Sequence, residues 1–376
     1  MPYADPERKR EYDRRRRATI REQFAALRQS VQYDADGKVR GRSVQYAPER
    51  EPYVPLPDAT LARRSTLVDA EGNVLQRWEI EKPDLAARDA AWREIATALA
   101  EGLPRAEPIP APAAVNSDLC ACYPIGDHHM GMLAWKYETG DSYDLDIGER
   151  LIGAAMAHLV EVTPACNNGL VVFLGDFMHY DSFVAVTPTS KNPLDADGRF
   201  PKMVRASIRS MRRVIEMAAA RHFHVRVIVE IGNHDLASSI FLMECLHNIY
   251  ENDPRISIDT SPRHFHYFSF GHVLVGTHHG HGVKAEQLPM IMATDQPEAW
   301  GAAKHRYWWT GHVHSRTAHD FRGVTVESFR ILPPPDAWAA NSGYRPIRDM
   351  KAIVLHREHG EVARYIVNPE MLRHAA

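Results

Sequence analysis

Five short polar stretches, each directly after an apolar run, constrain the fold of this chain more than any other feature. They are GDHHMG from Gly126, GD from Gly175, GNHD from Gly232, HGH from His279 and GHVH from Gly311. Nearly every histidine and carboxylate in them stands where a strand would end and a loop begin. Because α/β folds build their sites at the carboxyl ends of strands, the pattern predicts such a fold and such a site.

Apolar runs alternate with amphipathic segments from residue 118 onward. Strands are predicted at 118–125, 170–174 and 225–231, and helices at 148–162, 203–221 and 239–250. Later strands are predicted at 265–270, 273–276, 306–310, 324–329, 352–356 and 363–367. A β-α-β-α-β half followed by an antiparallel half predicts two packed sheets with helices outside. We therefore expect an α/β fold, a four-layer αββα sandwich of two mixed sheets, with the site at the carboxyl ends of the strands.

The N-terminal part of the chain has a different pattern. We expect a small, mainly helical extension over residues 1–103, with a charged helix at 5–30, irregular chain at 31–60, a hairpin at 67–80 and a helix at 84–99. Four prolines between Leu103 and Pro112 predict an extended linker. The expected domain boundaries are therefore 1–103 for the extension, 104–115 for the linker and 116–376 for the main domain.

Composition excludes several classes of protein. No apolar run approaches the roughly 20 residues of a membrane span, and the charged N-terminus has no apolar segment typical of a signal peptide. The four cysteines have neither zinc-ribbon nor CxxC spacing, and Cys120 and Cys122 would share one face of a strand as small core residues. We expect a cytoplasmic protein with no membrane partner.

The charge distribution says more than the net charge of −3. Residues 7–28 carry nine Lys/Arg against four Asp/Glu, including the consecutive run Arg14–Arg17. Such a run is usually a solvated helix face with internal ion pairs, and it is also the pattern of a nucleic-acid contact. The sequence leaves both interpretations open.

The donor types in the five stretches suit a pair of transition-metal ions. Imidazole, carboxylate and a single amide are preferred by first-row metals, and two such ions about 3.5–4 Å apart need a bridging carboxylate. Asp176 is the natural bridge, and Asp127 and His129 alternate along an extended segment so that both can face one ion. The remaining donors are Asn233, His279, His312 and His314.

Other polar residues in the same stretches suit proton transfer or substrate contact. His234 adjoins Asn233 and can donate a proton to a leaving group, and Asp235 can fix the tautomer of a neighbouring imidazole. These two are the candidate catalytic residues. The candidates for substrate contact are His128, His179 and His281.

In this order the motifs resemble those of the calcineurin-like metallophosphoesterases: D-x-H, G-D, G-N-H-D, H and G-H-x-H. The resemblance covers residues 118 to about 330. It implies one metal held by Asp127, His129, Asp176 and His314, and a second held by Asp176, Asn233, His279 and His312. It also implies in-line attack on phosphorus by a metal-bridging hydroxide, with His234 assisting the leaving oxygen. His278, His279 and His281 compete for the fourth motif, and His279 is chosen because the family often has His-Gly after that strand.

The motifs do not by themselves choose a phosphoester. GDFMH from Gly175 resembles the break-repair nuclease branch of the family, and residues 271–314 resemble metallophosphoesterases of bacteriophages and prophages. We therefore expect a DNA phosphodiesterase that uses two divalent ions, with manganese favoured and iron, zinc or magnesium compatible. The alternatives are a nucleotide or cyclic-nucleotide phosphodiesterase or phosphatase, and a non-catalytic DNA-binding protein with a structural metal site. The oligomeric state has no sequence signal.

Overall fold

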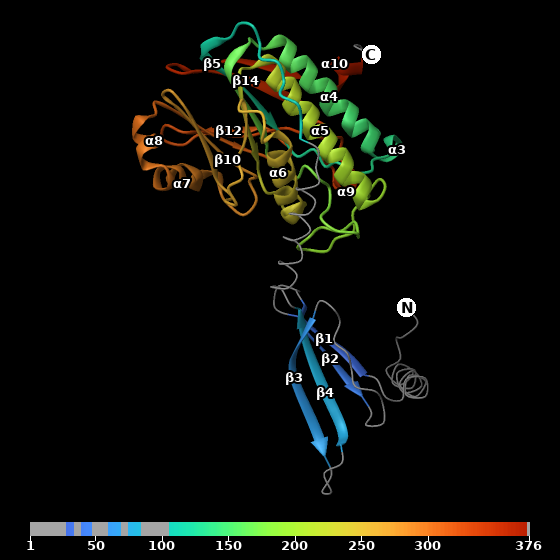
Figure 1. Ribbon diagram of the computed structural model, residues 1–376. Coiled ribbons are helices and arrows are strands. Elements are labelled where there is room, and N and C mark those ends of the chain that lie inside the picture. The colour runs from blue at the N-terminus through green and yellow to red at the C-terminus, as the bar shows by residue number, and fades with distance from the viewer. Residues whose placement is uncertain (1–27, 34–38, 47–58, 69–73, 84–104, 374–376) are drawn as a thin grey trace. The chain divides into compact units, whose positions relative to one another are not determined.

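The computed structural model describes residues 28–33, 39–46, 59–68, 74–83 and 105–373 (Figure 1). The chain divides into two compact units, Met1–Thr97 and Ala98–Ala376, and each is described by itself. The helix predicted at 84–99 and the Arg14–Arg17 run lie outside the described residues. So does the helix predicted at 5–30, except for its last three residues, which belong to a strand.

The described part of the first unit is a four-stranded antiparallel sheet with the strand order β1-β2-β4-β3. The strands are β1 (Arg28–Tyr33), β2 (Val39–Tyr46), β3 (Ala59–Val68) and β4 (Val74–Pro83). The hairpin predicted at 67–80 is confirmed and is longer at both ends, since β3 and β4 form it. The expectation of irregular chain at 31–60 is wrong for its described residues, 31–33, 39–46 and 59–60, which lie in strands, and residues 34–38 and 47–58 lie outside the described part of the chain. The expectation of a mainly helical extension is also wrong for the described residues. The sequence VRGRSVQY of β2 explains the error, because arginines dilute the apolar alternation that marks a strand.

The second unit contains a six-stranded mixed sheet with the order β15-β14-β5-β6-β7-β8. Its strands are β5 (Asn116–Ile125), β6 (Cys166–Phe173), β7 (His224–Val229), β8 (Ile256–Ile258), β14 (Met350–His356) and β15 (Gly360–Val367). Strands β5 to β8 are parallel, whereas β14 and β15 run antiparallel at one edge. The sequence predicted all of these except β8, whose three residues are too few to show a period.

Helices α4 (Leu145–Val162), α5 (Phe200–Arg221) and α6 (Leu236–Tyr250) cover one face of this sheet (Figure 1). Each of them was predicted, because each carries apolar residues at helical spacing. The Asp144 carboxylate accepts a hydrogen bond from the backbone N–H of Ile147 and caps α4, which begins three residues before the predicted start at Gly148. The shorter helices α3 (Lys136–Thr139), α9 (Ala337–Asn341) and α10 (Pro369–Arg373) were not predicted. No helix among the described residues is long and apolar enough to cross a membrane.

A five-stranded mixed sheet has the order β12-β13-β11-β10-β9. Its strands are β9 (His266–Phe270), β10 (Val273–His278), β11 (His305–Thr310), β12 (Thr317–Asp320) and β13 (Thr325–Ser328). The expected antiparallel half is wrong here, because β10, β11 and β13 are parallel neighbours. Helices α7 (Leu288–Asp295) and α8 (Pro297–Ala302) form the crossover that parallel pairing of β10 and β11 requires. Both are too short to show a helical period.

The two sheets pack face to face, and strand alternation decides which side chains lie between them. Cys120 and Cys122 face the second sheet, where they pack with residues such as Val275, whereas Ala121 and Tyr123 face the helices. On the far side, α7 packs on β10 and β11 around a core that includes Leu274, Trp308 and Met292. The predicted four-layer αββα sandwich is therefore confirmed, as is the expectation that Cys120 and Cys122 are buried core residues.

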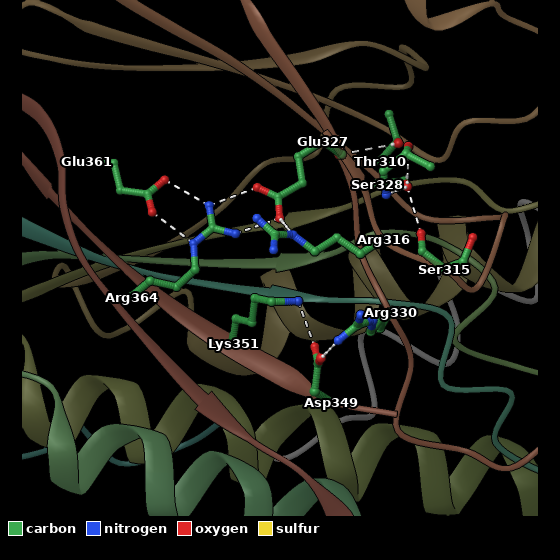
Figure 2. Close-up of polar contacts among 11 residues, drawn as sticks. Thr310, Ser315, Arg316, Glu327, Ser328, Arg330, Asp349, Lys351, Glu361 and Arg364 are labelled. Atoms are coloured by element: carbon green, nitrogen blue, oxygen red, sulfur yellow. Dashed lines mark hydrogen bonds and ion pairs between the residues drawn. The ribbon is translucent and has the colours of Figure 1, made fainter. Parts of the chain in front are cut away.

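A network of charges around the buried Glu327 joins β15 of the six-stranded sheet to β13 of the five-stranded sheet (Figure 2). Arg364 of β15 makes a bidentate ion pair with Glu327 of β13, at 2.5 and 2.8 Å, and also binds Glu361. Arg316 donates to the same Glu327 carboxylate at 2.9 Å. Because Glu327 is buried, these hydrogen bonds are needed to offset its desolvation and they fix how the sheets meet.

Candidate metal centre

The five polar stretches meet at the carboxyl ends of strands from both sheets. Asp127 and His129 follow β5, Asp176 follows β6, Asn233 follows β7, His279 follows β10, and His312 and His314 follow β11. Both sheets are therefore needed to assemble the group.

One set of donors comprises Asp127, His129 and His314, with one ligand atom of each within 4.8 Å of the others. The Asp127 Oδ2 atom lies 2.9 Å from Nε2 of His314, and that nitrogen lies 3.1 Å from Nε2 of His129. Burial lowers the pKa of His129 well below its ordinary value. Burial by itself would lower the pKa of His314, but the hydrogen bond and charge of Asp127 outweigh it and raise that pKa. Imidazole nitrogens that converge beside a buried carboxylate are the donors that a divalent cation binds.

A second set comprises Asp176, His279 and His312. The Nε2 atom of His279 lies 3.2 Å from Oδ2 of Asp176 and 2.9 Å from Oδ1 of Asn233. Its other ring nitrogen, Nδ1, donates to the carbonyl of Leu174 at 2.8 Å. That hydrogen bond directs Nε2 at the carboxylate and the amide oxygen, as a metal-binding histidine requires.

Asp176 is electrostatically linked to both sets. Burial by itself would raise the pKa of its carboxyl, but the charges of neighbouring histidines, with His279 first and His129 among them, hold it well below its ordinary value. Asp176 therefore stays a carboxylate that interacts with a histidine of each donor set, His279 of the second and His129 of the first. A ligand that bridges two ions must be such a carboxylate.

The choice among three neighbouring histidines has a structural answer. The ring of His278 stacks on Phe265 with centroids 4.7 Å apart, and its Nδ1 accepts from the N–H of Gly280. His281 is exposed, and its Nδ1 lies 3.5 Å from Nε2 of His312. His279 alone of the three lies against Asp176 and Asn233.

Backbone strain is concentrated in these loops. Of the six non-glycine residues with positive φ in the described part of the chain, four are candidate ligands: His129, Asp176, His312 and His314. Such conformations persist only where the surroundings enforce them, and they are typical of functional sites. Two glycines allow the close packing, because a Cβ on Gly232 would collide with Asp176 and one on Gly311 would collide with Asp127.

The structure corrects the expected partnership of His234 and Asp235. The Asp235 carboxylate accepts from the backbone N–H groups of Gly232 and Asp176 at 3.2 Å and of Met178 at 3.0 Å. Burial, then the charge of Asp176, raises its pKa to about 7. The Nδ1 of His234 donates instead to the carbonyl of His179 at 2.8 Å. Asp235 thus braces the loops, while a backbone carbonyl sets the His234 tautomer.

Two of the three candidate substrate contacts lie inside the protein. His128 is 1% exposed, its Nε2 lies 3.2 Å from the carbonyl of Gly148, and burial lowers its pKa to about 4. His179 is also buried, with Nδ1 3.3 Å from Nδ1 of His129. Their positions suit packing and support of His129, and only His281 of the three is exposed.

Some groups that shape the site were not found from the sequence. The carbonyls of Leu174 and His179 orient His279 and His234, and backbone acceptors leave no mark on residue identity. Asp181 differs from these carbonyls, because its place soon after Asp176 in the sequence already suited either substrate contact or structural support. It accepts from the N–H groups of Ala237 and Ser238 at 2.8 Å and so caps α6, which is a structural role.

The donor set fits a pair of first-row transition-metal ions. The candidate ligands in the described residues are imidazole nitrogens, carboxylates and one amide oxygen, and all four cysteines are buried in the core. Manganese, iron and zinc all accept these donors.

Comparisons with known proteins give structural likenesses only. No family model and no curated protein matches the chain. It is similar to a conserved uncharacterized protein, a predicted phosphoesterase, from Streptococcus pneumoniae TIGR4 (11% identity, 67% of this chain and 100% of that chain, TM-score 0.27). It is also similar to wild-type Vps29 complexed with Zn²⁺ from Entamoeba histolytica (14% identity, 66% and 98%, TM-score 0.25). A third likeness is to a putative 5′-nucleotidase from Staphylococcus aureus in complex with alpha-ketoglutarate (12% identity, 66% and 54%, TM-score 0.32).

Proposed function

We propose that this protein is a calcineurin-like metallophosphoesterase that hydrolyses phosphodiester bonds, with DNA as its substrate. The observation that carries the proposal is the pair of donor sets, Asp127 with His129 and His314, and Asp176 with His279 and His312. Asn233 completes the second set. Two bound divalent ions would neutralise phosphoryl charge and lower the pKa of a bound water. Manganese is the ion that the nuclease-like motif favours.

His234 is proposed as the group that protonates the leaving oxygen. Its Nδ1–H is committed to the His179 carbonyl, so Nε2 is the ring atom free to transfer a proton. Its backbone N–H donates to Oδ1 of Asp176 at 2.7 Å, which holds the residue beside the second donor set. Asp235 acts as a positioning residue, because it binds the loops that carry Asp176 and Asn233.

The test is a panel of phosphoesters incubated with purified protein and Mn²⁺. We expect hydrolysis of single- or double-stranded DNA and of bis(4-nitrophenyl) phosphate, and loss of both by at least about a hundredfold in Asp176→Asn. Faster turnover of nucleotides or cyclic nucleotides than of DNA would replace the substrate assignment. Salt-dependent DNA binding without hydrolysis under any metal would instead favour a binding protein with a structural metal site.

Metal content gives a readout independent of activity. Elemental analysis of the purified protein is expected to find two ions per chain, and His279→Asn should lose one of them. His278→Asn is the matched control, because His278 stacks on Phe265 instead of facing Asp176. Equal metal content in the two variants would contradict the assignment of His279.

A further inference from the structure

An exposed apolar surface lies directly beside His234. The side chains of Phe183 and Val184 are 80% and 65% exposed, and Leu236 and Ile240 are exposed one helical turn apart on α6. Asp181 holds these two segments together, because its carboxylate accepts from the N–H groups of the first turn of α6. Because Leu236 is two residues after His234 in the chain, this end of the surface adjoins the proposed proton donor.

The segment that carries Phe183 is basic, whereas the chain as a whole has a net negative charge. Residues 182–205 contain four Lys/Arg and two Asp, a net charge of +2, against −3 for the whole protein. The four cations are exposed: Lys191, Arg199, Lys202 and Arg205. Asp197, one of the two acids, is occupied as an acceptor for the N–H of Leu145.

The aromatic and basic residues of this segment adjoin one another. The ring of Phe183 contacts that of Phe200, with centroids 5.6 Å apart, and Phe200 is the first residue of α5. Arg199 and Lys202 flank Phe200 in the chain, so their charges lie at the same end of α5 as the Phe183 ring. Figure 1 shows that α5 and α6 pack side by side, which places this surface at one end of the helical layer.

We propose that this surface, formed by residues 182–205 and the first turn of α6, binds the leaving side of a single-stranded DNA substrate. The exposed ring of Phe183 stacks on the base of the leaving nucleotide, and Arg199 and Lys202 contact the phosphates beyond it. Single-strand binding proteins combine aromatic stacking platforms with cationic tracks in this way, and stacking tolerates any base. The inference rests on the proposed function, since His234 defines which side is the leaving side.

Base stacking is tested by a thermodynamic cycle that combines a substitution in the protein with removal of a base from the DNA. Binding of a fluorescent single-stranded oligonucleotide is measured by anisotropy without added metal, so that no cleavage intervenes. Phe183→Ala should weaken binding about tenfold, the scale of one lost base stack, and Phe183→Trp should restore it. Met290→Ala is the matched control, because Met290 is a similarly exposed apolar side chain on α7.

The DNA half of the cycle locates the stacked base. With Mn²⁺ present, an abasic residue placed directly on the leaving side of the cleaved phosphate should raise the KM of the wild type about tenfold. The same substrate should be cleaved equally by the wild type and Phe183→Ala, because the stacking partner is already missing. A full additional loss in the variant would overturn the assignment.

The charged residues have a separate readout. Arg199→Gln with Lys202→Gln should lower the slope of log affinity against log salt concentration by about 1.4, as two lost phosphate contacts on a single strand predict. The control Lys304→Gln removes an exposed charge at the end of α8, before β11, and should leave the slope unchanged. An unchanged slope in the double variant would contradict the phosphate contacts.

These outcomes separate this inference from the proposed function. Hydrolysis of bis(4-nitrophenyl) phosphate with unchanged DNA affinity in Phe183→Ala would refute the binding surface and leave the phosphoesterase intact. Absence of all ester hydrolysis, with DNA binding that still depends on Phe183, would refute the phosphoesterase and retain the surface.

Discussion

At the scale of single residues, two positions in the site require glycine. A Cβ atom at Gly311 would collide with Asp127, and one at Gly232 would collide with Asp176. The backbone of His312 donates to both oxygens of Asp127 at 3.0 Å, so the loop after β11 is held directly against a candidate ligand.

Gly311→Ala should therefore weaken metal binding without unfolding the protein. The added methyl group would displace the Asp127 carboxylate, and displacement of a ligand-supporting contact costs about 10–100-fold in metal affinity. Titration calorimetry with Mn²⁺ measures the affinity, and circular dichroism checks the fold. Gly301→Ala is the control, because a Cβ there meets nothing within 4 Å. Equal affinities in the two variants would show that Asp127 does not bind metal.

The residue types of the site could be predicted from the sequence, but their neighbours could not. Asp127, His129 and Asp176 stand after strands that are recognisable as apolar runs. The remaining candidate ligands were identified from the order of the motifs along the chain. The role of Asp235 was predicted wrongly, because adjacency to His234 in the chain suggested a contact that a backbone carbonyl makes instead. His128 was a candidate substrate contact because it adjoins His129 in the sequence, but its ring packs inside the protein against Phe177 and the carbonyl of Gly148.

At the scale of elements, polar side chains between strands decide how the two sheets are joined. His266 of β9 contacts Glu230, just after β7, at 3.0 Å, and Thr277 of β10 donates to the same carboxylate. All three side chains are buried. A charged pair in this position makes the joint between the sheets dependent on pH.

Stability contributed by His266 should be present at low pH and disappear at high pH. Burial lowers the pKa of His266, but the hydrogen bond and charge of Glu230 outweigh it, so the folded-state pKa lies above the ordinary value of 6.5. Its contribution is complete below pH 6.5 and is lost as the pH rises through the raised pKa. Urea unfolding from pH 5.5 to 9 measures this. The difference in unfolding free energy between the wild type and His266→Gln should shrink as the pH rises. The control His319→Gln, at an exposed position, should show no such pH-dependent difference from the wild type.

The Glu327–Arg364 pair gives the second prediction at this scale. Arg364→Met should destabilise the protein by about 3 kcal/mol, because it leaves the buried Glu327 carboxylate with Arg316 as its remaining cation. Arg364→Met with Glu327→Leu should cost less than the single change, because no buried charge is then left. Chemical denaturation of both variants tests this. Additive losses would mean that the two side chains do not interact.

Element prediction succeeded where burial imposes a clear period and failed where it does not. Strands β5, β6 and β7 are buried and largely apolar towards their carboxyl ends, where they read LCACYPI, LVVF and VIV. Helices α7 and α8 are eight and six residues long, and each has a proline at its first or second residue, so neither shows a repeat. Missing them also removed the crossover, which is why β10 and β11 were expected to be antiparallel.

At the scale of the whole molecule, the predicted linker is attached to the second unit. The N–H of Ala106 donates to the carbonyl of Ile249 at 2.8 Å, and that of Ile109 donates to Asp253 at 3.1 Å. Arg255 in turn donates to the carbonyl of Ile109. Residues 105–109 therefore belong structurally with α6, although their prolines suggested a free spacer.

A truncation that separates the two units should begin at residue 98. Removing residues 1–97 is expected to retain hydrolysis of bis(4-nitrophenyl) phosphate, because every candidate ligand lies in the second unit. If the Arg14–Arg17 run contacts DNA, the same truncation should reduce DNA affinity and its salt dependence. Removal of residues 1–112 should additionally lower the melting temperature, because it deletes the contacts of Ala106 and Ile109. Equal melting temperatures of the two truncations would contradict that attachment.

The strand order β14-β5-β6 has a consequence for synthesis of the chain. The partner on one side of β5 is β14, which begins 225 residues after β5 ends, at Met350 against Ile125. At ribosomal rates of about 5–20 residues per second, that edge waits about 10–45 seconds for its neighbour. An unpaired edge of apolar sequence invites pairing with other chains, so this interval is when the nascent protein depends most on chaperones.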